Sequence, residues 1–171
     1  MGNDIAYGFL PAQILAWVEE AADRLLAHTS DVILTDLPAE TVQSLSPPSF
    51  LFFRTLFLPS SRVGRDATVA RMNDVNQGLA SLASKRQLRL VHLKPHWYGL
   101  DPIHFRPGCW REAWREILLG EESALPVPPL SLREWARLQT LPPDRRWLLG
   151  VERSSPQSGR RLGRGGRIWL Y

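Results

Sequence analysis

The chain has 171 residues, enough for one domain of ordinary size with a substantial core. Its 44% of hydrophobic and 22% of charged residues exclude a disordered or fibrous protein, and no apolar run approaches the roughly 20 residues of a membrane-spanning helix. The net charge of +4 comes from the C-terminus, because five of the 21 basic residues and no acidic residue follow position 152. The rest of the chain, with 16 basic and 17 acidic residues, offers no broad basic surface.

The single cysteine, Cys109, excludes an internal disulfide, which fits a reducing compartment. No charged region followed by an apolar stretch opens the chain. We therefore see no secretory signal and expect a cytoplasmic location.

The first half of the chain predicts a helix, a strand and one ambiguous segment. Residues 1–8 are a polar, turn-like stretch with glycines at both ends. Residues 11–28 begin with a proline and repeat apolar side chains at helical spacing, which predicts an amphipathic helix. Residues 31–38 predict a buried strand that ends at a proline. Residues 50–58 follow a Pro-Pro-Ser break and are apolar nearly throughout, so periodicity does not separate a strand from a buried helix.

The second half predicts three helices and a strand. Residues 66–86 predict a long helix with Asp66 as its N-cap. Residues 88–93 predict a strand, and residues 107–120 predict a helix that stops at a glycine. Residues 131–139 open with the Ser-x-x-Glu spacing of a capping box and predict a short helix.

The order of these elements predicts an α/β fold. Alternating helices and strands favour a layered structure with a mainly parallel sheet. Residues 146–152 and 166–171 look like the two strands of a C-terminal β-hairpin. In parallel sheets, functional sites gather beyond the carboxyl ends of strands. The loop 94–106 follows the carboxyl end of a predicted strand, so we expect a functional site in this loop.

This loop carries Asp101 and His104 in the sequence Asp-Pro-Ile-His. A histidine that acts as a general base needs a carboxylate that orients the ring and stabilises the imidazolium. Only two residues separate the pair, and Pro102 restricts the backbone between them. The spacing therefore predicts a compact His–Asp dyad.

The start of the chain adds a second candidate group. Asn3 lies on a predicted turn beside Gly2 and ahead of a helix. An amide there can donate a hydrogen bond to a developing oxyanion, and the glycine would let the backbone approach closely.

Together these motifs resemble the SGNH hydrolases, the GDSL-type esterases and lipases, over about residues 1–120. Asn3 and Asp4 match the end of the family's Gly-x-Asn-Asp motif, and Asp101 and His104 match its Asp-x-x-His motif. The resemblance implies a flavodoxin-like three-layer α/β/α sandwich. It further implies a triad of Ser, His104 and Asp101, an oxyanion hole that includes Asn3, an acyl-ester substrate, and no metal or organic cofactor.

The chain departs from the family in two ways. The glycine of the Gly-x-Asn-Asp motif would fall at position 1, which is Met1. No Gly-Asp-Ser motif, the source of the family's nucleophile, occurs in the 171 residues. We therefore expect residues 1–120 to be a partial SGNH-like domain without its nucleophile. Residues 121–171 would form an extension with a short helix and a β-hairpin.

A partial sheet has a physical consequence. The family sheet has five strands, whereas this chain predicts about two, at 32–36 and 88–93. Helices 11–28 and 66–86 would then expose apolar surface beside an unpaired strand edge. We expect marginal stability or self-association through that edge. We also expect an in-frame Gly-Asp-Ser motif in the genomic sequence before Met1.

Other features have simpler interpretations. His92, His96, Asp101 and His104 could suggest a metal site, but the H-x3-H spacing falls on a strand and a loop, and we expect no metal. Cys109 is a possible replacement nucleophile, although a small packing residue is the simpler interpretation.

The aromatic residues have two interpretations each. Trp97 and Tyr98 flank the dyad and could wall a substrate pocket or simply cover the loop. The remaining tryptophans on predicted helices are interpreted as core or groove lining: Trp17, Trp110, Trp114 and Trp135.

The Arg/Gly-rich tail is typical of segments that contact nucleic acid. The rest of the chain has no matching basic face, so we favour a solvated hairpin loop. The alternative to a hydrolase is thus a non-catalytic remnant or interaction module, with this tail as one possible contact.

Overall fold

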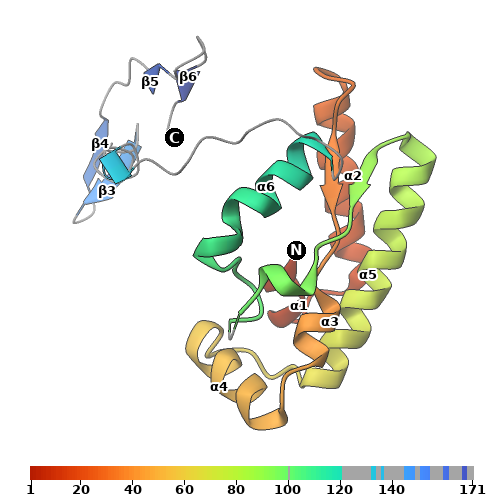
Figure 1. Ribbon diagram of the computed structural model, residues 1–171, viewed down its shortest axis with the longest axis vertical. Coiled ribbons are helices and arrows are strands. Elements are labelled where there is room, and N and C mark those ends of the chain that lie inside the picture. The colour runs from red at the N-terminus through yellow and green to blue at the C-terminus, as the bar shows by residue number, and fades with distance from the viewer. Residues whose placement is uncertain are drawn as a thin grey trace. The chain divides into compact units, whose positions relative to one another are not determined.

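The structure is a computed structural model that describes residues 1–99 and 101–120 and several short segments beyond them (132–133, 136, 145–148, 151–154, 160–161 and 167–168). The chain divides into two compact units, Met1–Val127 and Pro128–Tyr171. The elements of the first unit (Figure 1) are α1 (Gly2–Ala6), α2 (Pro11–Leu26), β1 (Ile33–Thr35), α3 (Ala39–Gln43), α4 (Pro47–Phe57), α5 (Arg65–Arg86), β2 (Arg89–Val91), the 3₁₀ helices η1 (Pro95–Trp97) and η2 (Pro107–Cys109), and α6 (Trp110–Leu119).

The first unit is mixed α/β with a parallel sheet, as the sequence predicted. Strands β1 and β2 pair in parallel, with Leu34 opposite Leu90. Within the described residues each strand has only this one partner. The predicted strands 31–38 and 88–93 are therefore confirmed, and each is shorter in the structure than its predicted range.

Helices cover both faces of this small sheet. Leu34 and Leu90 pack against the main apolar core, whose members come mostly from α2, α3 and α5. Ile33 and Val91 point to the other face, where they pack against a cluster that contains Ala113 of α6. The alternation follows from the two-residue period of a strand.

Helices α2 and α5 run side by side and confirm the two longest predicted helices (Figure 1). The start of α2 and the end of α5 have identifiable physical causes. Pro11 occupies the first turn of α2, where a missing N–H costs nothing. Gln87 adopts the left-handed conformation at φ 56°, which ends α5 and leads directly into β2. Asp66 lies in the first turn of α5, but the N-cap is Gly64, so the predicted cap is wrong.

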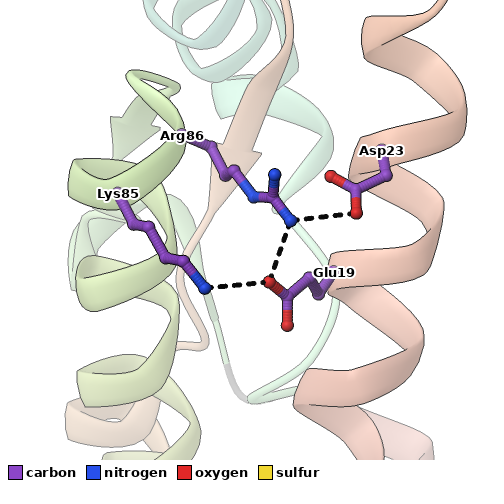
Figure 2. Close-up of polar contacts among 4 residues, drawn as sticks. All are labelled: Glu19, Asp23, Lys85 and Arg86. Carbon is purple, nitrogen blue, oxygen red and sulfur yellow. Dashed lines mark hydrogen bonds and ion pairs between the residues drawn. The ribbon is translucent and has the colours of Figure 1, made fainter.

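Four charged side chains join these two helices (Figure 2). Glu19 Oε1 of α2 accepts hydrogen bonds from Arg86 Nη2 at 3.1 Å and Lys85 Nζ at 3.5 Å. Arg86 Nη2 also donates to Asp23 Oδ2 at 3.0 Å. The pKa of Glu19 is lowered, first by the hydrogen bond from Arg86 and then by the charge of Lys85.

Helix α4 resolves the ambiguous apolar run. The Pro-Pro-Ser break is the start of this helix, because Ser46 Oγ accepts a hydrogen bond from the Ser49 N–H. The helix is not buried as expected, since none of its residues is buried and Phe52 is 60% exposed. In the described part of the chain, no helix is both long enough and apolar enough to cross a membrane.

Residues 1–8 are not simply a turn. They contain helix α1, whose Ile5 is completely buried in the main core. The apolar Ile5 anchors this helix, because its burial removes a large apolar surface from water. Gly8, with φ 96°, follows the helix in the left-handed region that favours glycine.

The second unit contains strands β3 (Arg145–Leu148), β4 (Val151–Ser154), β5 (Arg160–Arg161) and β6 (Arg167–Ile168). β3 pairs with β4 and β5 with β6, both antiparallel. The predicted hairpin between 146–152 and 166–171 is wrong, because β6 pairs with β5 and the described residues of 146–152 pair within β3 and β4. The segment 146–152 does not form one strand, because Leu148 of β3 pairs with Val151 of β4. The predicted helix 131–139 lies mostly outside the described residues, although Leu132, Arg133 and Ala136 are helical.

Candidate active site

A closed loop after β2 carries the Asp-Pro-Ile-His motif. Its two ends meet in an antiparallel bridge between Tyr98 and Phe105. The Arg106 N–H donates to the Trp97 carbonyl at 2.8 Å just outside this bridge. The Trp110 indole donates to the Phe105 carbonyl at 2.9 Å and ties the loop to α6. The backbone therefore turns back on itself, as the dyad requires.

The base of the loop is anchored in the protein interior. Trp97 is completely buried, and its indole Nε1 donates to Glu112 Oε1 of α6 at 3.1 Å. His96 Nε2 lies 2.8 Å from the same oxygen. These two contacts, with that of His96 first, lower the pKa of Glu112. Burial raises the pKa of Tyr98 well above its usual range, and the charge of Asp36 adds to this.

Asp101 and His104 form the predicted pair. His104 Nδ1 lies 2.6 Å from Asp101 Oδ2. The other oxygen of Asp101, Oδ1, accepts a hydrogen bond from the Ile103 N–H at 2.9 Å. With the proton on Nδ1, the ring donates to the carboxylate and leaves the Nε2 lone pair to accept a proton. The His104 side chain is 68% exposed and that of Asp101 30% exposed, so the ring is accessible.

Asn3 reaches the same region from the start of the chain. Gly2 and Asn3 of α1 line a cavity together with Pro102 and Ile103, the two residues between the members of the dyad. The Asn3 side chain is exposed, and its amide has no hydrogen-bond partner among the described residues. The amino-terminal motif and the dyad loop, about a hundred positions apart, thus border one cavity.

A buried hydroxyl helps to place α1 there. Ser61, 8% exposed, donates from Oγ to the Ala6 carbonyl at 2.6 Å. Ser61 belongs to the connection between α4 and α5. This bond therefore holds the carboxyl end of α1 against the segment that follows α4.

The cavity is small and mostly apolar. Its volume is about 70 Å³. One aromatic ring links it to the dyad, because Phe57 of α4 lines the cavity and its ring centroid lies 5.9 Å from that of His104. The sequence analysis did not identify Phe57, because no local sequence pattern predicts that α4 contacts a loop nearly fifty residues later.

Other predicted residues lie elsewhere. Asp4 pairs with the amino group of Met1 at 2.8 Å and lines a groove along β1, so it does not face the cavity. Trp97 and Tyr98 are buried in the core and do not wall this pocket, which favours the interpretation that they cover the loop. Cys109 Sγ lies 3.7 Å from the His96 carbonyl, a contact that suits a packing role.

A second histidine–carboxylate pair lies at the carboxyl ends of the strands. Asp36 follows β1 and His92 follows β2, and His92 Nδ1 lies 2.8 Å from Asp36 Oδ2. Asp36 Oδ1 also accepts from the Leu93 N–H at 2.8 Å. The sequence contained a signal for this pair, because parallel strands bring their carboxyl ends together. No three metal-ligating side chains cluster in the part of the chain that the structure describes.

Comparisons with known protein families, with curated proteins and with solved structures found no match for this chain.

Proposed function

We propose that this chain carries the acid–base part of an SGNH-type serine ester hydrolase. The observation that carries the proposal is the placement of Asn3 and the His104–Asp101 loop around one cavity. The two-stranded parallel sheet with helices on both faces is compatible with part of a flavodoxin-like three-layer sandwich. Further strands of such a sandwich would join at the side of β1 that has no partner strand in the described part of the chain.

Each group has a defined role in the proposed reaction. A serine hydroxyl outside these 171 residues attacks the acyl carbonyl, and its proton passes to His104 Nε2. Asp101 holds the ring by Nδ1 and stabilises the imidazolium. The Asn3 amide donates to the oxyanion that forms on the carbonyl oxygen. His104 then returns the proton to the leaving alcohol, and an acyl-serine remains for hydrolysis by water.

An ester assay tests the part of this proposal that the chain itself carries. Imidazole bases act on activated esters, so the chain should hydrolyse 4-nitrophenyl acetate slowly through His104. After subtraction of the rate in buffer, we expect His104→Ala to hydrolyse the ester at least about tenfold more slowly than the wild type. Asp101→Asn should reduce the hydrolysis rate by a similar factor, because the His104 ring would take the wrong tautomer.

His28 is the matched control, because it is also exposed and lies at the end of α2. His28→Ala should retain the wild-type rate. Equal rates in all four proteins would contradict the proposed role of the dyad. The nucleophile is tested in the genomic sequence, where an in-frame Gly-Asp-Ser before Met1 supports the proposal and a nearby stop codon contradicts it.

A second candidate, an interaction module, is favoured by exposed apolar side chains. Trp17 and Leu25 of α2 are 47% and 52% exposed. Trp114 and Leu118 of α6 are 51% and 56% exposed. Residues at these spacings lie on one helix face. Such exposed stripes mark interaction surfaces in monomeric proteins.

A further inference from the structure

We propose that the cavity beside the dyad binds the acyl group of the substrate and selects short, apolar acyl chains. This inference rests on the proposed function, because it names the substrate class of the same site. The cavity lies between α1, α4 and the dyad loop, and its lining residues near the dyad are Asn3, Phe57, Pro102 and Ile103.

The position of the cavity is the first argument. Asn3, Phe57 and Ile103 are exposed residues that line it, so the cavity reaches the surface at the loop that carries the dyad. Phe57 contacts the His104 ring edge to face. An ester carbonyl held between Asn3 and His104 would therefore point its acyl chain into this cavity.

The chemistry of the lining is the second argument. Most of the lining is aliphatic or aromatic: Val42, Leu45, Phe50, Phe53, Phe57, Leu58, Met72 and Ile103. Apart from Asn3, which lies beside the dyad loop, the polar side chains that line the cavity already have partners. Ser61 donates to the Ala6 carbonyl, Thr68 Oγ1 to the Gly64 carbonyl at 2.9 Å, and Arg54 Nη1 to the Val63 carbonyl at 3.3 Å. A polar group inside the cavity would lose its hydration without gaining a partner, which is costly.

The size of the cavity is the third argument. An apolar cavity of about 150 Å³ is known to hold benzene, a six-carbon ring. A cavity of about 70 Å³ therefore suits about two to four carbon atoms. Acetyl to butyryl groups fit this volume, whereas an octanoyl chain exceeds it.

Binding can be measured without catalysis. We would label the methyl groups of Ile103 and Met72 and titrate the full chain with methyl butyrate and with methyl octanoate by NMR. The Met72 side chain is 3% exposed and lines the cavity, so its methyl reports on entry into the interior. For methyl butyrate we expect saturable shifts at both methyls with a Kd on the order of 1 mM.

Two variants and one control locate the binding. Ala6→Leu fills the cavity and should weaken methyl butyrate binding at least about fivefold, since the apolar volume is occupied. Ala12→Leu is the control on an exposed face of α2 and should bind as the wild type does. If Ala6→Leu does not fold, Ile103→Ala tests the same idea, because a wider cavity should improve binding of methyl octanoate.

The outcomes separate this inference from the proposed function. Methyl shifts that are absent, or that persist equally in Ala6→Leu, would overturn the cavity assignment. Binding at the cavity without His104-dependent hydrolysis would support the assignment and contradict the dyad's role. His104-dependent hydrolysis that is insensitive to acyl length and to Ala6→Leu would overturn the assignment and leave the dyad's role intact.

Discussion

Gly78 lies where α5 passes close to α2. A Cβ atom at this position would lie 3.0 Å from Leu15 Cγ and closer still to both Leu15 methyl carbons. Leu15 is partly buried and packs against the main core, so its side chain must shift to admit the added atom. Overpacking should cost about 1 to 3 kcal/mol against a gain of about 1 kcal/mol in helix propensity, so we expect Gly78→Ala to destabilise the protein by up to about 2 kcal/mol. Urea denaturation measures the difference.

Gly108 provides the control for this substitution. A Cβ at Gly108 would meet no atom within 4 Å, so Gly108→Ala should change stability by less than about 0.5 kcal/mol. Leu15→Ala should reduce the cost of Gly78→Ala in a double-mutant cycle. An increase in stability in Gly78→Ala would show that the two helices are not in close contact there.

Contacts between individual residues also show which parts of the site are determined by the local sequence. Asp101 and His104 are three positions apart, so a turning loop suffices to bring them together. The Asp36–His92 pair spans 56 positions, and the contact of Phe57 with His104 spans nearly as many. The Asp36–His92 pair follows only once β1 and β2 are paired in parallel, and the Phe57–His104 contact depends on the position of α4, which no local pattern indicates.

Among the elements, α2 and α5 are held together by packing and by the ion pairs of Figure 2. Folding lowers the pKa of Glu19 below its ordinary value of 4.5. The stability that this shift contributes is therefore present above pH 4.5 and is lost as the pH falls through the folded-state pKa. We expect the urea midpoint of the wild type to fall more steeply than that of Glu19→Gln between about pH 6 and pH 3.

Glu20 is the control for this pH dependence. Among the residues that the structure describes, it pairs only with Arg24, within α2, and both side chains are largely exposed. Glu20→Gln should follow the wild-type profile, because its pair does not join two helices and exposed pairs contribute little. Parallel profiles for Glu19→Gln and the wild type would show that the network does not couple α2 to α5. High salt should reduce the difference between them.

At the scale of the first unit, the side of β1 that has no partner strand among the described residues is the main surface of interest. A groove of about 290 Å³ follows it, and we call this the β1-edge groove. It is lined by Met1, Asp4, Ile14, Trp17, Val18, Ala21, Ala22, Leu25, Val32, Ile33 and Leu34. Unpaired strand edges beside apolar surface are sites of association between chains. We expect the protein to self-associate with increasing concentration, as measured by sedimentation velocity.

Substitutions in the groove test this expectation. Trp17→Arg places a charge in the β1-edge groove and should shift the protein towards monomer. Leu51→Arg on α4 is the control, because Leu51 is similarly exposed, at 51%, and does not line the groove. A wild-type protein that remains monomeric at high concentration would contradict the prediction. An equal effect of both substitutions would point to unspecific association.

The sequence by itself determined the long elements and the dyad. Helical periodicity identified α2, α5 and α6, and apolar runs identified β1 and β2. These signals are local, since each depends on residues within a few turns of one another. Periodicity did not separate helix from strand for α4, because its apolar residues lack a clear period. Within 146–152, the prediction missed the connection that separates β3 from β4.

Only the tertiary structure decided what surrounds the dyad. The cavity forms where α1, α4 and the dyad loop meet, and the side chains that line it are distant in sequence. The tertiary structure also decided which tryptophans are buried, since Trp97 is fully enclosed while Trp17 and Trp114 are about half exposed. Burial depends on which surfaces meet, and this is a property of the whole arrangement and not of any one segment's composition.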